Sequence, residues 1–161
     1  MRTCRFRQGG RELYGIVEGQ AVRALSAAPW QGGLPEGPVR KLPEVTLLAP
    51  VEPSKVVCVA RNFRAHARET GQEVPREPLL FLKPSTAVIG PMAEIRLPAA
   101  SAEVHHEAEL ACVVGRALSR ATPAESRAGI FGYTCLNDVS ARDIQRAEQH
   151  FTRAKSFDTF C

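Results

Sequence analysis

The sequence predicts an α+β fold in which β-strands dominate. Short apolar runs, some of them alternating with polar residues, recur along the chain and are typical of strands. Helix signals are confined to a few brief segments. A doubly wound α/β fold would instead alternate its strands with longer amphipathic helices, so this mixture favours the α+β class.

Residues 1–45 are predicted to form a small N-terminal β unit. In TCRFRQ, Cys4 and Phe6 alternate with two arginines, and GIVEGQAVRAL is typical of a β-hairpin. The following PWQGGLPEGP is rich in Gly and Pro and is predicted to be an irregular connector. From residue 50 the sequence pattern changes to apolar runs with short helix signals, and residues 50–161 are predicted to form a second, larger domain.

The elements of this second domain are predicted from local signals. Strands are expected at KVVCVA, PLLFLKP, residues 107–115 and FGYTCLNDVS. KVVCVA and LACVV, the apolar part of the third strand, are expected to be buried. Between the first two strands, NFRAHARET is predicted to form a short helix that Asn62 caps and Gly71 ends. Farther on, Thr122 and Glu125 have the spacing of a capping box. Ser140 is predicted to cap a last helix, ARDIQRAEQ.

Composition argues against several classes of protein. No apolar stretch approaches the ~18 residues of a transmembrane helix, so no membrane partner is expected. The N-terminus lacks the apolar segment of a secretory signal, and a cytoplasmic location is therefore expected. Net charge is +4, but the arginines are spread along the chain without a basic block, so no nucleic-acid partner is expected.

The five cysteines indicate a reduced protein. They lack C-x-x-C spacing, and Cys58, Cys112 and Cys135 lie inside apolar, strand-like runs. This pattern predicts buried, reduced thiols rather than a disulfide framework or a zinc site.

Three carboxylates are candidates for a metal site. Glu107 and Glu109 lead into an apolar strand, and because side chains of a strand alternate, both are expected on one face, roughly 7 Å apart. Asp138 ends another apolar strand just before a helix. Three acids without a matching Cys or His set favour a hard cation, Mg²⁺ before Mn²⁺ or Ca²⁺. The alternative is that the acids mark an exposed strand edge.

Two further pairs share helix faces. His66 and Glu69, at i and i+3, form a pair in which the carboxylate can orient the imidazole as a general base. The alternative is an ordinary surface ion pair. Arg142 and Gln145 have the same spacing, and an arginine can hold a substrate carboxylate through two parallel hydrogen bonds. Taken alone, Arg142 is equally an exposed arginine.

Five strings of residues resemble the fumarylacetoacetate hydrolase family. In chain order they are KVVCVARNFRAHARE, EPLLFLKPSTAVIGP, HHEAELACVVGR, YTCLNDVSARDIQ and TRAKSFDTFC. The resemblance covers about residues 50–161, and the N-terminal unit is similar to the small leading domain of bacterial members. It implies a fold of twisted, mixed sheets with short helices. It also implies a divalent metal held by Glu107, Glu109 and Asp138.

The resemblance further implies roles for other residues. His66 and Glu69 match a catalytic dyad on a lid helix, and Lys155 matches a lysine that offers positive charge to a developing oxyanion. Arg142 and Gln145 would bind the substrate carboxylate, and we also predict Lys83, in FLKP, to contact the substrate. Phe63 stands where relatives often carry Tyr, which removes a phenol next to the dyad.

The implied function is catalysis on 2-oxo acids or their enols through a metal-chelated enolate. We expect a 2-hydroxyhepta-2,4-diene-1,7-dioate isomerase or decarboxylase in aromatic catabolism, working as a homodimer on a small-molecule substrate. Acylpyruvate hydrolase and oxaloacetate decarboxylase activities remain alternatives. An inactive family member and a basic polyanion-binding module are alternatives of another class. Because relatives continue past AKSFDTFC, we also expect this chain to be the leading part of a longer protein.

Overall fold

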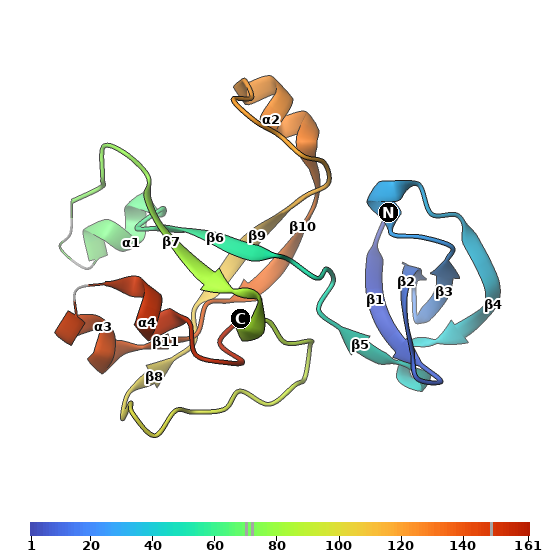
Figure 1. Cartoon of the computed structure of the whole chain (residues 1–161), viewed down its shortest axis with the longest axis horizontal. Helices are drawn as coiled ribbons and strands as arrows, with labels where there is room; N and C mark the ends of the chain where they lie inside the picture. The colour runs from blue at the N-terminus through green and yellow to red at the C-terminus, as the bar shows by residue number, and fades with distance from the viewer. Residues whose placement is uncertain (70, 72, 149) are drawn as a thin grey trace. The chain divides into compact units, whose positions relative to one another are not determined.

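The computed structural model describes residues 1–69, 71, 73–148 and 150–161, apart from the side chain of His66. By its internal contacts the chain divides into two compact units. The first contains Met1–Glu52, Ile89–Ala93 and Ala108–Leu136, and the second contains Pro53–Val88, Glu94–Glu107 and Asn137–Cys161. Strands dominate the chain as a whole and the helices are short, as predicted (Figure 1).

The first unit is built on a five-stranded antiparallel sheet with the strand order β4-β3-β2-β1-β5 (Figure 1, blue to cyan). Its strands are β1 (Thr3–Gln8), β2 (Arg11–Glu18), β3 (Ala21–Leu25), β4 (Pro35–Lys41) and β5 (Thr46–Leu48). The predicted hairpin is β2–β3, turning at Gly19, whose φ of 58° suits glycine. Phe6 and Val22, each 1% exposed, fill the core of this sheet.

The predicted irregular connector is partly wrong. Its beginning does form only a 3₁₀ turn, Pro29–Gln31, but its end is strand β4, Pro35–Lys41. Among the described residues β4 pairs only with β3, and the register of this pairing shifts between Arg23 and Ala24. An edge strand with an irregular register tolerates Pro and Gly, because one side of its backbone needs no ladder partner.

A second hairpin in the first unit joins β9 (Ala108–Val114) to β10 (Ile130–Asn137), with α2 (Pro123–Gly129) between them. The predicted capping box starts α2: Thr122 Oγ1 accepts the N–H of Glu125 at 3.3 Å, and the Glu125 carboxylate accepts the N–H of Thr122 at 2.8 Å. The prediction of a buried LACVV strand is wrong, because Leu110 and Val114 are 65% and 63% exposed. Exposure alternates along β9, so one of its faces is uncovered in this chain.

The cysteine prediction holds only in part. All five cysteines are free thiols, and Cys58 is half-buried. Cys112 and Cys135, however, are exposed, because they lie on the uncovered side of the β9–β10 hairpin rather than in a core.

The second unit is organised around the antiparallel hairpin of β6 (Lys55–Ala60) and β7 (Leu79–Pro84). One face of the hairpin carries Phe81, 8% exposed, and Lys83, fully buried. The opposite face is apolar and exposed, with Val57 opposite Leu82 and Val59 opposite Leu80, so the prediction of a buried KVVCVA strand is wrong. The remaining elements are α1 (Arg64–Glu69), a 3₁₀ turn (Ser85–Ala87), β8 (Val104–His105), β11 (Ser140–Ala141), α3 (Arg142–Glu148) and α4 (Phe151–Lys155).

The core of the second unit lies where β11, α3 and α4 meet. It contains Val139, Ala141, Ile144, Ala154 and Phe160. β11 pairs with β8, and α4 contacts β7, so residues far apart in the sequence are brought beside the buried face of the β6–β7 hairpin (Figure 1). Within the described residues, no helix has both the length and the apolar character needed to cross a bilayer.

Candidate active site

Asp138 lies between two strands, where β10 has ended and β11 has not yet begun. Its backbone N–H donates to the Glu107 carbonyl at 2.9 Å, and the Glu107 N–H donates to the Asn137 side-chain oxygen at 3.0 Å. These two bonds bring the segments before β9 and after β10 together. Two of the three predicted carboxylates, Glu107 and Asp138, are therefore neighbours in the second unit.

Lys155, the last residue of α4, joins these two carboxylates. Its ammonium donates to Glu107 Oε2 at 2.6 Å, to Asp138 Oδ2 at 2.7 Å and to the Ser140 hydroxyl at 2.7 Å. It also lies 5.3 Å from the centre of the Phe81 ring. Only 3% of Lys155 is exposed, so these contacts are strong for an ion pair in a protein.

Lys83 approaches Asp138 from the other side. Its ammonium donates to Asp138 Oδ1 at 2.6 Å, to the Lys155 carbonyl and, at a longer 3.4 Å, to the Val139 carbonyl. The prediction that Lys83 contacts the substrate differs from this arrangement. The Lys83 ammonium is fully buried and its N–H donors bond to groups inside the protein, so it has no donor left for a ligand. Lys83 instead fixes Asp138 and the end of α4.

Arg142 and Gln145 share one face of α3, as their spacing predicts. Arg142 Nη1 donates to Gln145 Oε1 at 2.8 Å, and Nη2 donates to Glu107 Oε1. The largest single influence on the pKa of the Glu107 carboxyl is its partial burial, which by itself would raise that pKa. The hydrogen bonds and charges of Lys155 and Arg142 outweigh this, so its pKa lies below the ordinary value. Glu107 is therefore held as a carboxylate between two cations.

The other predicted site residues are described less completely. Glu109 is the second residue of β9, is half-buried, and belongs to the first unit. Glu69 ends α1, the helix predicted between Asn62 and Gly71, and is exposed. His66 lies on the same helix, but its side chain is outside the described part of the structure. The predicted His66–Glu69 dyad thus remains a prediction.

The chemistry of the site fits a hard divalent cation. Such ions take carboxylate oxygens as ligands, and Glu107 and Asp138 already share one cationic group, the Lys155 ammonium. Among the described residues, no set of three His, Cys, Asp or Glu side chains lies close enough together to hold a metal ion.

Sequence reasoning missed Ser140. It was expected to cap the last helix, but α3 begins at Arg142, and Ser140 is instead a fully buried residue of β11. Its hydroxyl donates to the Asp138 carbonyl at 3.0 Å and accepts from Lys155. The signal that could have identified it is its position two residues after Asp138, on the same side of an extended segment.

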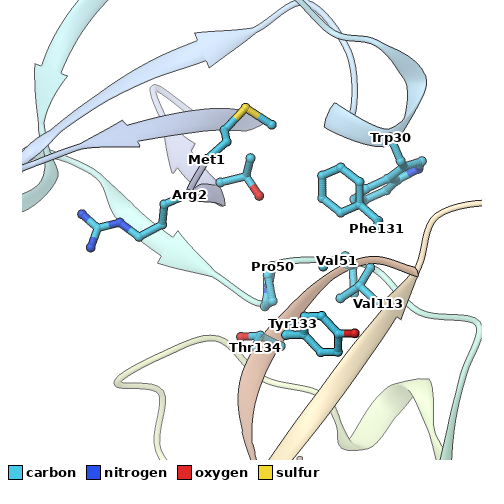
Figure 2. A pocket seen from close by; sticks show the side chains of 11 residues that line it. Met1, Arg2, Trp30, Pro50, Val51, Val113, Phe131, Tyr133 and Thr134 are labelled. Carbon is cyan, nitrogen blue, oxygen red and sulfur yellow. The ribbon is translucent and has the colours of Figure 1, made fainter. Parts of the chain in front are cut away.

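A separate pocket of about 360 Å³ lies in the first unit (Figure 2). Its lining includes Trp30 and Phe131, whose rings meet edge to face at 5.6 Å, together with Arg2 and Tyr133. Of the described residues that line it, none is a predicted site residue. The charged cluster of the second unit is therefore the better candidate for catalysis.

The sequence and the fold correspond to a known family of enzymes. Residues 55–161 match the family model described as fumarylacetoacetate (FAA) hydrolase C-terminal, and residues 1–50 match the Rv2993c-like N-terminal model. The chain belongs to the fumarylacetoacetate hydrolase family. The predicted family and fold class are thereby confirmed, and family members include isomerases and hydrolases.

Individual relatives refine this picture. Protein Rv2993c of Mycobacterium tuberculosis is 52% identical over 120 residues, covering 74% of this chain and 45% of that protein. Oxaloacetate tautomerase FAHD2A, mitochondrial, of Homo sapiens is 43% identical over 149 residues, covering 91% of this chain and 46% of that protein. The chain thus spans about half the length of these curated relatives.

A solved structure shows the same fold. The 2-hydroxyhepta-2,4-diene-1,7-dioate isomerase from Mycobacterium marinum superposes with a TM-score of 0.89 and 39% identity. The superposition covers 100% of this chain and 63% of that one.

Proposed function

We propose that the chain forms the metal- and substrate-binding part of an enzyme acting on 2-oxo acids or their enols, of the 2-hydroxyhepta-2,4-diene-1,7-dioate isomerase type, in aromatic catabolism. The observation that carries the proposal is a single cluster in which Lys155 joins Glu107 to Asp138, while Arg142 and Gln145 adjoin Glu107. Paired carboxylates, a lysine and an arginine are the groups needed to bind and polarise a 2-oxo acid.

Glu107 and Asp138, with Glu109, would hold the metal, for which Mg²⁺ is the first candidate and Mn²⁺ or Ca²⁺ the alternatives. When bound, such an ion acts as a Lewis acid toward the 2-oxo and carboxylate oxygens of the substrate. Arg142 would orient the far carboxylate, with Gln145 holding the guanidinium in place. Lys155 would stabilise the negative charge of the enolate oxygen, and His66 with Glu69 would move the proton.

A second candidate is oxaloacetate keto–enol tautomerisation. The relative that covers 91% of this chain carries that activity in its name. The chemistry needs the same enolate stabilisation and proton transfer, without cleavage of a C–C bond. The hydrolase and decarboxylase alternatives require one more step each, the addition of water or the loss of CO₂.

We further propose that the protein works as a homodimer in the cytoplasm. The exposed apolar face of the β6–β7 hairpin, with Val57, Val59, Leu80 and Leu82, supports association, because such a face is costly to leave in water. Light scattering after size exclusion should give twice the mass of one 17.5 kDa chain. A monomer at all concentrations tested would contradict the dimer.

The test of the activity is a panel assay. The purified chain would be incubated with 2-hydroxyhepta-2,4-diene-1,7-dioate, oxaloacetate and an acylpyruvate, each with EDTA, Mg²⁺ or Mn²⁺, and followed by the ultraviolet absorbance of the enol. We expect turnover of at least one substrate only with metal, and its loss in Glu107→Gln. Metal-independent turnover would overturn the proposed metal dependence. No turnover with any 2-oxo acid would overturn the proposed activity and favour an inactive family member.

A further inference from the structure

We propose that Lys155 is an internal counter-ion that competes with the divalent cation for Glu107 and Asp138, so that metal binding releases its ammonium toward an anionic substrate. This inference rests on the metal dependence within the proposed function. It concerns what Lys155 does before substrate arrives.

The contacts of Lys155 leave it fully occupied. A lysine ammonium has three N–H donors, and here they go to Glu107 Oε2, Asp138 Oδ2 and Ser140 Oγ, at 2.6, 2.7 and 2.7 Å. In this state Lys155 has no donor for an enolate oxygen. The predicted role of Lys155 therefore requires a change that frees it.

The charges of the cluster explain why metal binding would be that change. Each carboxylate contacts two cations: Glu107 binds Arg142 and Lys155, and Asp138 binds Lys83 and Lys155. Three positive groups thus surround two negative ones. A divalent cation added to this arrangement is repelled unless one of the three withdraws.

Lys155 is the group best placed to withdraw. Lys83 is fully buried and also bonded to backbone carbonyls, so its ammonium is fixed. Of the two carboxylates, Arg142 pairs among the described residues with Glu107 alone, through the oxygen that Lys155 does not use. Lys155 alone among these three contacts both carboxylates, as a shared metal ion would. Its flexible stem allows the ammonium to turn away while the backbone of α4 stays in place.

Direct metal titration separates competition from a merely structural ion pair. The 161-residue chain would be stripped with EDTA and titrated with Mn²⁺ by calorimetry, as wild type, Lys155→Met and Lys155→Arg. Removing the competing charge should tighten Mn²⁺ binding about tenfold or more in Lys155→Met, equivalent to ~1.4 kcal/mol. Lys155→Arg keeps the charge and should bind no more tightly than wild type. Unchanged or weaker binding by Lys155→Met would overturn the proposal.

A second measurement uses only the wild-type chain, so it tests the release of Lys155 even if Lys155→Met does not fold. The rate of lysine acetylation would be followed by mass spectrometry in EDTA and in Mn²⁺. Lys155 should react about tenfold faster once Mn²⁺ is bound, because its amine is no longer held between carboxylates. Exposed Lys41 and Lys55 serve as reactive references, and fully buried Lys83 as the protected one. An unchanged Lys155 rate would reject the release.

The outcomes distinguish this inference from the proposed function. If neither protein binds Mn²⁺, the metal dependence fails and the inference fails with it. If Mn²⁺ binds but the Lys155→Met affinity and the Lys155 acetylation rate are unchanged, only the release of Lys155 is rejected.

Discussion

Lys83 and Asp138 form a buried ion pair at 2.6 Å, with Lys83 0% exposed and Asp138 5% exposed. Removing two charges from water costs several kcal/mol per ion, and attraction alone seldom compensates. Here the cost is reduced by further partners: Lys83 also donates to the Lys155 carbonyl, and Asp138 also accepts from Lys155. The pair therefore connects β7 to both segments that form the site.

The first prediction is that Lys83→Met lowers the free energy of unfolding by about 3–5 kcal/mol, the usual effect of breaking a buried ion pair from one side. The variant leaves Asp138 Oδ1 and the Lys155 carbonyl without their donor. Urea denaturation followed by circular dichroism would measure the change. Lys55→Met, on the exposed face of the neighbouring strand, should change stability by less than ~0.5 kcal/mol. A loss below ~1 kcal/mol in Lys83→Met would show that the pair contributes little.

The sequence predicted those features that depend on local spacing. The hairpin at Gly19, the capping box of Thr122 and Glu125, and the contact between Arg142 and Gln145 each involve residues a few positions apart. Period-two and period-3.6 patterns encode such neighbours directly. The family motifs also identified Glu107, Asp138 and Lys155, which the structure brings into contact.

The features that were missed depend on long-range packing. The burial of Lys83 follows from the approach of α4 and the segment after β10 to one face of β7, which no local pattern reveals. Ser140 was misread because a serine before a helix is usually a cap, and its role depends on Lys155, fifteen positions later. The exposure of Leu110 and Val114 was missed because an apolar run does not say which of its faces the chain covers.

The second prediction concerns acid stability. Asp143, at the start of α3, accepts hydrogen bonds from the Ser101 hydroxyl at 2.6 Å and the Ala102 N–H at 2.8 Å. The Ser101 bond, and then the Ala102 bond, hold the pKa of Asp143 below its ordinary 3.8. Because the folded pKa is the lower one, the stabilisation is fully present above that ordinary value and is lost as pH falls through the folded pKa.

Asp143→Asn should therefore be less stable than wild type at pH 7 and should lose less stability on acidification to about pH 3. Thermal unfolding at several pH values would measure both effects. Asp158→Asn, at an exposed position, provides the control. Parallel stability profiles for wild type and Asp143→Asn would show that these bonds are weak in solution.

The third prediction concerns substrate binding. Arg142→Ala should raise KM about tenfold or more with a smaller change in kcat, because the arginine would hold a carboxylate in both the ground and transition states. Arg142→Lys should recover little of the loss, since lysine cannot form two parallel hydrogen bonds. Because Arg142 also contacts Glu107, Mn²⁺ affinity should be measured for each variant. An unchanged KM for every 2-oxo acid tested would remove Arg142 from the substrate site.

The last prediction separates proton transfer from binding. In the proposed function His66 transfers the proton, and Glu69 on the same helix would orient it. His66→Ala should lower kcat by ~10²-fold or more with a modest change in KM, the usual scale for the loss of a general base. Glu69→Gln, which keeps the shape of the side chain but removes its charge, should give a smaller loss of kcat. Mn²⁺ affinity should stay at the wild-type value in both variants, since neither residue is a proposed metal ligand. If kcat is unchanged in His66→Ala, or falls only in step with Mn²⁺ affinity, another group must transfer the proton.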